Sequence, residues 1–363
     1  MDRAVLRMID ANANRASEGA RVLEDAARLG LGRADLSARC KSLRHGLRAA
    51  LAGIAGAELL ASRDTPRDVG TGLTGAGETG RADLAGVCTA AAKRLGEALR
   101  VLEETLKLSP TGGAAAGAIK ALRYEGYELE KQVVLALSRP RRQWTLCVLI
   151  TEALCTHHPW EEVARAAIRG GADCLQLREK EMAGRTLLER AKTLVRIAAE
   201  TPGPDGGHAD VIINDRADIA LASDAAGVHI GQTDLPIEAA RSVVGPMKLV
   251  GVSTSKLEEA RKAFEEGADY VGLGPMYPSG TKPKDRLAGI EYLREFVEWN
   301  QKRVAEVGGL PFPHVAISGI DASRAGSLAS AGCAGVAVSS VVCSSVEPER
   351  VCVEIVRAMR AQA

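Results

Sequence analysis

Residues 268–285, ADYVGLGPMYPSGTKPKD, are the segment in which chemistry is easiest to recognise. Apolar residues alternate with glycine over residues 270–274, which predicts a buried strand. Directly after it, Ser279, Thr281 and Lys282 offer two hydroxyls and a cation around Gly280. Hydroxyl donors beside a cation suit phosphate oxygens. A solvated basic surface loop would look similar in isolation, so the rest of the chain must decide.

A second polar group lies in LQLREK, residues 175–180. In a strand, alternate side chains share a face, so Gln176, Arg178 and Lys180 point one way and Leu177 and Glu179 the other. An arginine and a lysine that face an interior need anions, and a polyphosphate is a natural partner for them.

Two carboxylates follow the next two predicted strands. Asp215 comes after DVIIN, and Asp234 comes shortly after GVHIGQ. Oxygen ligands of this kind suit Mg²⁺, which often takes one or two carboxylates and completes its shell with water and substrate phosphate. The alternative is that Asp215 only caps a helix that begins at Arg216.

The elements that must position these residues are short Val/Ile/Leu-rich strands that alternate with helical segments from Trp144 onward. Eight such units are predicted: strands at residues 145–151, 174–180 and 210–216, followed by GVHIGQ, KLVGVST, YVGLGPM, HVAISG and GVAVSSVV. Eight units over this length predict an α/β fold, the (β/α)8 TIM barrel, in which polar strand ends converge on one site. A doubly wound open sheet is less suitable, because no G-x-G-x-x-G follows the first strand.

Composition excludes several classes of function. The chain of 363 residues has 47 basic and 46 acidic residues, and a net charge of +1 gives no field to recruit nucleic acid or a membrane. The charged start lacks a signal peptide's apolar core, and no apolar run is long enough to span a bilayer, so we expect a cytoplasmic protein. The eight cysteines form no CxxC pair and are expected to be buried, reduced thiols.

Residues 1–140 differ in character: they have helical periodicity, and we expect an all-α domain ahead of a barrel at residues 141–363. Two segments repeat at an offset of 79 residues, which predicts two helical hairpins. The offset matches Arg15 with Arg94, Arg21 with Arg100 and Arg44 with Arg123. These arginines either form a solvated salt-bridge face or face a shared anionic ligand. The Gly-rich segment 62–81 fails as a Walker loop.

The barrel half resembles the thiamine phosphate synthase family. The motifs QLREK, IINDRADIAL, GVHIGQTD, GVS, DYVGLGP, S-x-T-K and SGI carry this resemblance, which covers residues 145–360. It implies an enzyme that joins hydroxymethylpyrimidine diphosphate to thiazole phosphate and releases pyrophosphate, with Mg²⁺ as cofactor. It also implies a dissociative mechanism, in which none of the six histidines needs a catalytic role.

The resemblance assigns roles residue by residue. The implied pyrimidine diphosphate site is Gln176, Leu177, Arg178, Glu179, Lys180, Asn214, Ser253 and Lys282, of which Arg178, Lys180, Ser253 and Lys282 are catalytic. The implied thiazole phosphate site is Ser279, Gly280, Thr281, Gly319, Val338 and Ser339. Asp215 and Asp234 match the magnesium ligands.

Three positions depart from the family pattern. Ser318 replaces a usual glycine, Glu152 stands where the family tends to have Asp, and Ser279 stands where threonine is common. Because none of them removes a cation or a metal ligand, we expect them to tune the site.

The helical half resembles the domain fused ahead of such synthases and associated with hydroxymethylpyrimidine phosphate kinase activity. This implies that it makes the diphosphate from the monophosphate, with ATP as a candidate donor, and our candidate residues are Arg21, Arg100, Asp64 and Asp68. The alternative for this half is a non-catalytic oligomerisation module in a homo-oligomer. For the barrel, the alternative is an isomerase of the thiazole tautomerase type, which needs no magnesium carboxylates.

Overall fold

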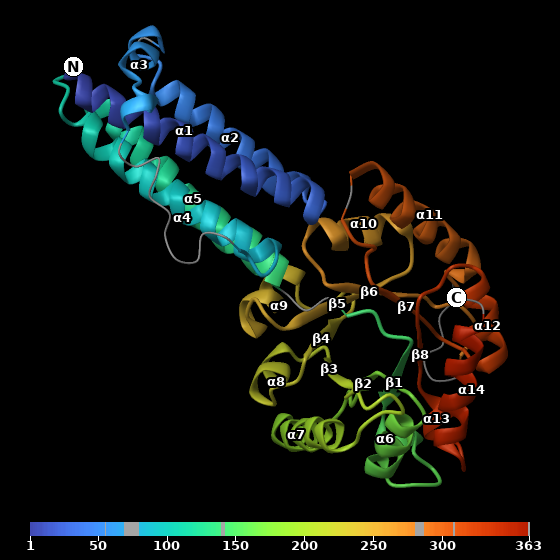
Figure 1. Cartoon of the computed structure of the whole chain (residues 1–363). Coiled ribbons are helices and arrows are strands. Elements are labelled where there is room, and N and C mark those ends of the chain that lie inside the picture. Colours follow the sequence, from blue (N-terminus) through green and yellow to red (C-terminus); the bar gives the residue numbers. More distant parts are fainter. Residues whose placement is uncertain (55, 69–79, 139–141, 280–286, 308, 362–363) are drawn as a thin grey trace. The chain divides into compact units, whose positions relative to one another are not determined.

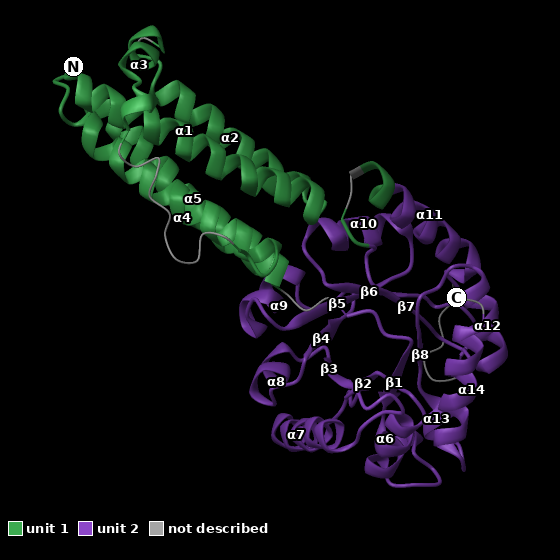
Figure 2. Ribbon diagram, viewed as in Figure 1, with its two compact units in different colours: residues 1–138, 303–310 green, residues 139–302, 311–363 purple. Residues whose placement is uncertain are grey.

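The computed structural model describes residues 1–54, 56–68, 80–138, 142–279, 287–307 and 309–361. It contains two compact units (Figure 2): residues 1–138 with 303–310, and residues 139–302 with 311–363. The boundary expected after residue 140 lies in 139–141, outside the described residues.

The first unit is entirely helical, as predicted (Figure 1). Its elements are α1 (Arg3–Asp25), the π-helix η1 (Ala26–Gly30), α2 (Ala34–Ala50), α3 (Gly56–Ser62), the 3-10 helix η2 (Thr65–Arg67), α4 (Leu84–Leu106) and α5 (Gly113–Ser138). The repeated segments form two hairpins, α1 with α2 and α4 with α5, and α1 also packs along α4. Apolar side chains at helical spacing, among them Leu23, Leu99 and Leu102, form one core between these helices.

Each hairpin is joined by a buried ion pair at the same place in the repeat. Arg44 of α2 lies 2.7 Å from Glu24 of α1, and Arg123 of α5 lies 2.9 Å from Glu103 of α4. Burial disfavours ionisation of Glu103, but the hydrogen bonds and charges of Arg123 and Arg100 outweigh burial and lower its pKa. The duplicated polar residues therefore help to hold together the two helices within each hairpin.

The second unit is a closed barrel of eight parallel strands in sequence order, which confirms the predicted fold class. The strands are β1 (Leu146–Ile150), β2 (Cys174–Leu177), β3 (Asp210–Asn214), β4 (Gly227–Ile230), β5 (Leu249–Thr254), β6 (Tyr270–Leu273), β7 (His314–Ile317) and β8 (Val336–Val338). The helices between and after them are α6 (Trp160–Arg169), α7 (Gly184–Glu200), α8 (Ala217–Ala222), α9 (Ile237–Val244), α10 (Leu257–Glu265), α11 (Gly289–Val307), α12 (Ala322–Ser330), α13 (Ser340–Cys343) and α14 (Pro348–Arg360), with the 3-10 helix η3 (Glu152–Leu154) after β1.

Strand alternation separates two apolar layers. In β1, Val148 packs outward in the layer shared with the helices, while Cys147 and Leu149 belong to the cluster inside the barrel. Tyr270 also lies inside, opposite Gly251 in the β5–β6 register. A Cβ at Gly251 would lie 2.0 Å from the Tyr270 ring, so only glycine leaves room for this side chain. Apolar and aromatic side chains such as Cys147, Leu149 and Tyr270 thus fill the barrel interior. Polar groups line the cavity at the carboxyl ends of the strands.

Seven of the eight cysteines are buried, and Cys155 is partly exposed. Within the described residues, no helix combines the length and the apolar character needed to cross a membrane.

His314 in β7 is buried in a position that requires a neutral ring. The backbone N–H of Ala334 donates to its Nε2 at 3.1 Å, which leaves the proton on Nδ1, 3.3 Å from the carbonyl of Phe312. Burial lowers the pKa of His314 from 6.5 to about 4. If His314 were protonated, its Nε2 would also carry a hydrogen and would face the N–H of Ala334, which is a donor and cannot accept it.

We predict that this histidine makes the barrel acid-sensitive. Because its pKa is lower in the folded state, its contribution is complete above about pH 6.5 and is lost as the pH falls towards 4, at a cost of about 3 kcal/mol. Urea unfolding of the full chain at several pH values should show a shallower acid loss for His314→Gln than for wild type. The exposed His157→Gln serves as control, and equal slopes for all three proteins would contradict the assignment.

Candidate active site at the barrel mouth

A cavity of about 580 Å³ opens at the carboxyl ends of the barrel strands. The predicted residues that line it are Gln176, Arg178, Asn214, Ser253, Ser279, Gly319, Val338 and Ser339. They come from strands and loops far apart in the sequence, so barrel closure brings them together. Residues 280–286 follow Ser279, so Gly280, Thr281 and Lys282 lie outside the described residues.

Three residues of QLREK do not line this cavity. Leu177 is buried in the apolar layer between barrel and helices, because strand alternation turns it outward. Glu179 pairs with Arg190 at 2.9 Å and accepts the backbone N–H of Glu152 at 2.7 Å. Lys180 is exposed, and its charge acts on Asp215. The side chains of Leu177 and Glu179 therefore have packing and pairing roles in this structure.

A buried hydrogen-bonded chain underlies the polar part of the cavity. His229 of β4 contacts the Tyr270 hydroxyl through Nδ1 at 3.0 Å and the Ser253 hydroxyl through Nε2 at 2.9 Å. Burial raises the pKa of Tyr270, so its hydroxyl keeps its proton. His229 and Tyr270 line the cavity but were not among the predicted residues. The strand alternation that places Ser253 inward could have identified them, since both lie on interior positions of neighbouring strands.

Asp215 and Asp234 meet beside the barrel mouth. Asp215 has a left-handed backbone (φ 62°), and its N–H donates to the carbonyl of His229 at 2.8 Å. Asp234 accepts the N–H of Gly231 at 2.7 Å. Burial and then the neighbouring Asp234 carboxylate raise the pKa of Asp215, while Lys180 and Arg178 partly offset this. Two carboxylates at such close range repel each other unless a proton or a cation lies between them.

The capping alternative for Asp215 does not fit this geometry. Helix α8 begins at Ala217, and Arg216, the residue before it, makes no side-chain cap hydrogen bond. No group of three His, Cys, Asp or Glu side chains that could hold a metal ion occurs in the described parts of the chain. A pair of carboxylates still suits Mg²⁺, because this ion keeps several waters and takes substrate phosphate oxygens as further ligands. The donor set therefore fits the expected metal.

On the opposite side of the cavity, the β7 end supports the segment that leads into the predicted phosphate loop. Ser318 has φ 91° and donates its hydroxyl to the carbonyl of Tyr277 at 2.8 Å. The guanidinium of Arg324 lies 4.8 Å from the centre of the Tyr277 ring and also lines the cavity. The departure at Ser318 thus ties two loops together and adds no group that blocks the cavity centre. Arg324 is a cation near this site that the sequence did not reveal, since it follows the strand on a helix.

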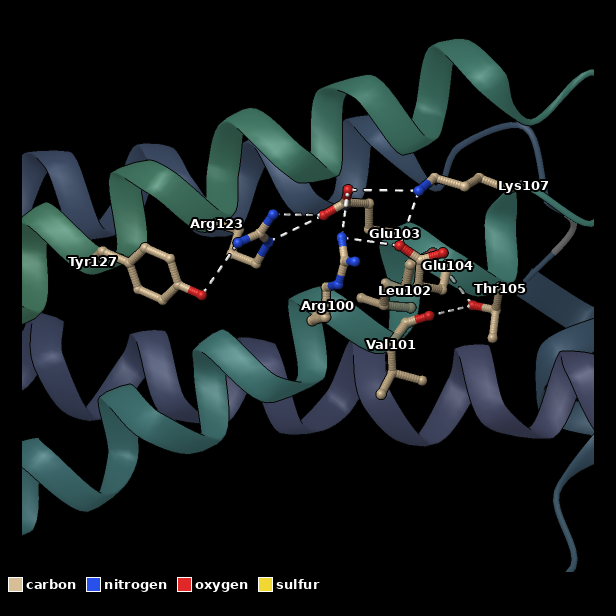
Figure 3. Close-up of polar contacts among 9 residues, drawn as sticks. All are labelled: Arg100, Val101, Leu102, Glu103, Glu104, Thr105, Lys107, Arg123 and Tyr127. Atoms are coloured by element: carbon tan, nitrogen blue, oxygen red, sulfur yellow. Dashed lines mark hydrogen bonds and ion pairs between the residues drawn. The ribbon is translucent and has the colours of Figure 1, made fainter.

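The candidate residues of the helical unit have other surroundings. Arg21 pairs with Asp25 at 3.2 Å, and Arg100 pairs with Glu103 and Glu104, both at 2.9 Å (Figure 3). Asp64 pairs with Arg67 at 3.1 Å, and Asp68 lines an open cleft beside α1. The salt-bridge interpretation of the repeated arginines fits these contacts.

Comparisons with known proteins place this chain in a family. A family model described as thiamine monophosphate synthase matches residues 146–342, and a ThiD2 family model matches residues 7–132. The chain belongs to the thiamine monophosphate synthase family. It is 41% identical over 350 residues to a thiamine-phosphate synthase of Rhodopirellula baltica, with 94% of this chain and 88% of that protein covered. It is 39% identical over 349 residues to one of Synechocystis sp., with 95% and 93% covered.

A solved structure of a thiamine phosphate pyrophosphorylase from Pyrococcus furiosus resembles the barrel part of this family member. It has a TM-score of 0.51 and 33% identity, and the match covers 60% of this chain and 96% of that one. The similarity to the two relatives covers nearly the whole chain, and so both units. The solved structure matches 60% of the chain, which is about the share that the barrel unit makes up.

We predict that a small substitution destabilises the barrel at Gly319 but has little effect on its stability at Ser318. Gly319 has φ 64°, and a Cβ there would lie 2.4 Å from the carbonyl oxygen of Pro278. Gly319→Ala should therefore destabilise the barrel by more than about 1 kcal/mol, while Ser318→Gly should change stability by less than about 1 kcal/mol, because relief of backbone strain offsets one lost hydrogen bond. Urea unfolding tests both, and a Gly319→Ala protein as stable as wild type would contradict the close approach.

Proposed function

We propose that the barrel joins a hydroxymethylpyrimidine diphosphate to a thiazole phosphate, forming thiamine phosphate and pyrophosphate. The observation that carries this proposal is one cavity with a cation and polar donors inside, Arg178, Asn214 and Ser253, and a carboxylate pair beside it. The names of the full-length relatives support the same reaction.

The chemistry asks for charge stabilisation and positioning. The bond between the pyrimidine methylene and the diphosphate oxygen breaks, and its electron pair leaves with pyrophosphate. The lone pair of the thiazole nitrogen then forms the new C–N bond to the methylene carbon. Arg178 stabilises the negative charge that grows on the leaving group, and interactions that strengthen in this way lower the barrier. Lys180 and Lys282 are assigned the same role by their family motif.

Asp215 and Asp234 would hold Mg²⁺, which supplies charge neutralisation to the leaving diphosphate when bound. The hydrogen-bonded chain from Tyr270 through His229 fixes the direction of the Ser253 hydroxyl at the cavity wall. No step needs a protein nucleophile or a general base.

The tautomerase-like alternative is less suitable for these residues. An isomerase that acts on a monophosphate has no evident use for a carboxylate pair whose mutual repulsion favours a bound cation.

We predict that removing one charge of the pair disables the barrel. Asp234→Asn and Asp215→Asn should each lower turnover by about a hundredfold or more, because the bound cation loses an anionic ligand. Turnover with preformed diphosphate should be followed as a function of Mg²⁺ concentration. Circular dichroism should show the fold unchanged. Near-normal turnover of either variant at limiting Mg²⁺ would remove the metal assignment.

We also propose that the helical unit phosphorylates the pyrimidine monophosphate to the diphosphate that the barrel consumes. The support is the ThiD2 family match over residues 7–132 and its occurrence in one chain with a diphosphate-consuming barrel. The oligomerisation alternative predicts no such activity.

The full chain provides a direct assay. With pyrimidine monophosphate, ATP and Mg²⁺, the Asp234→Asn protein should accumulate the diphosphate, since the barrel step is blocked, while wild type with thiazole phosphate should form thiamine phosphate. Phosphorus NMR distinguishes the products. A wild-type protein that uses preformed diphosphate but never the monophosphate with ATP would leave the helical unit as a scaffold.

A further inference from the structure

Two of the three matched pairs of arginines in the helical unit, Arg21 with Arg100 and Arg44 with Arg123, form ion pairs within the unit. Glu24 and Glu103, only 10% and 4% exposed, each accept from a buried arginine of the facing helix. Arg21 adds to the first cluster, and the more exposed Arg100 adds to the second, which Figure 3 shows. Because these cations already have carboxylate partners in both copies of the repeat, a ligand phosphate would have to displace internal ion pairs to reach them.

The first repeat carries a second polar group that its copy lacks. An open cleft of about 460 Å³ lies along α1, with Arg7, Asn12 and Arg15 from this helix and Asp68 and Val101 from elsewhere in the unit. At the repeat offset of 79 residues, the first two correspond to Gly86 and Ala91. The polar lining therefore exists at one end of one hairpin, where the internal symmetry is broken.

The two arginines of this cleft are less engaged than Arg21, Arg44 and their counterparts, although Arg15 itself is matched by Arg94 in the second copy. Arg15 is exposed and has neither a hydrogen bond nor an ion pair within the part of the chain that the structure describes. Arg7 makes one long contact, from Nη2 to the carbonyl of Asp64 at 3.3 Å. Arg15 follows Arg7 by eight positions, a rise of about 12 Å along α1. Both side chains line the cleft. Met8 and Ala11 lie between them and give the cleft an apolar floor.

A half-exposed ion pair links α1 to the segment that carries Asp68. Asp10, 13% exposed in its side chain, accepts both Nε and Nη2 of Arg63 at 2.7 and 2.8 Å. This bidentate pair anchors the segment that runs from Ser62 to Asp68 beside α1. The repeat equivalent of Asp10 is Thr89, so the anchor also belongs to one copy alone.

We propose that this cleft binds the phosphate monoester of the pyrimidine substrate, with Arg15 as the main phosphate ligand, Arg7 as the second cation and Asp10 as a positioning residue that acts through Arg63. An apolar floor between two arginines suits a flat heterocycle that carries a phosphate, and a guanidinium can grip phosphate oxygens through two hydrogen bonds. The inference rests on the proposed kinase function of this unit and identifies where its acceptor substrate binds.

The test compares Arg15→Ala with Arg94→Ala in the full chain, since Arg94 is the repeat equivalent of Arg15 and does not line the cleft. A lost charge-assisted contact corresponds to a factor of about 10 to 100. Arg15→Ala should therefore raise KM for the pyrimidine monophosphate by at least about tenfold, with KM for ATP and barrel turnover of preformed diphosphate near wild type. Arg94→Ala should leave both KM values and barrel turnover near wild type. Asp10→Asn, like Arg15→Ala, should raise KM for the pyrimidine monophosphate.

A second measurement does not depend on turnover. Phenylglyoxal modification, mapped by mass spectrometry, should show that the pyrimidine monophosphate protects Arg15 and Arg7 but not Arg94. Protection without any phosphorylation would overturn the kinase function and support the cleft as a phosphate ester site. Equal effects of Arg15→Ala and Arg94→Ala, or no protection of Arg15, would overturn the proposed site.

Discussion

The alternation of side chains along the eight closed strands is the constraint on which the barrel site depends. It turns Val148 and Leu177 outward to the helices and Cys147, Gln176 and Tyr270 inward, so the polar and apolar demands of one short strand are met on different faces. The Tyr270 ring fits only because Gly251 lies beside it, and its hydroxyl then holds His229 against Ser253. The position of the Ser253 hydroxyl in the site thus depends on how Tyr270 packs against Gly251 inside the barrel.

Electrostatics adds a second condition. Burial and the Asp234 carboxylate raise the pKa of Asp215, and Lys180 and Arg178 only partly offset this, so among the described residues the site holds like charges close together with cations nearby. Such an arrangement is unfavourable for an empty site and favourable for one that binds an anion together with a cation. In contrast, Glu103 in the helical unit has Arg123 and Arg100 as partners, and its pKa is lowered. The same residue types therefore pair with each other in one unit, whereas in the other they serve the ligand binding that we propose.

Sequence periodicity predicted the barrel, because eight strand-like segments with inward polar ends leave few other folds. Alternation placed Gln176, Arg178 and Lys180 on one face, and the first two line the cavity. Lys180 is exposed and does not line it, because the strand ends at Leu177 and alternation does not extend beyond it. Periodicity did not predict that Glu179 would be used by Arg190, or that Arg324 would reach the site from a helix, because both contacts depend on tertiary packing. The family motif assigns one role to all five residues from Gln176 to Lys180. In the structure, the side chains of Leu177 and Glu179 point away from the cavity that Gln176 and Arg178 line.

The helical unit shows a related limit and a way around it. Repetition drew attention to the matched arginines, yet matched residues in a duplicated hairpin are those that every copy needs in order to fold, and Glu24–Arg44 and Glu103–Arg123 fit that description. A single ligand needs a site only once, so binding residues should be sought where the copies differ. Arg7 and Asp10 are such differences, as glycine and threonine replace them in the second copy. Arg15 is matched by Arg94, so the two copies differ in the residues around this arginine, and those asymmetric neighbours are what single out the first copy as the binding site that we propose.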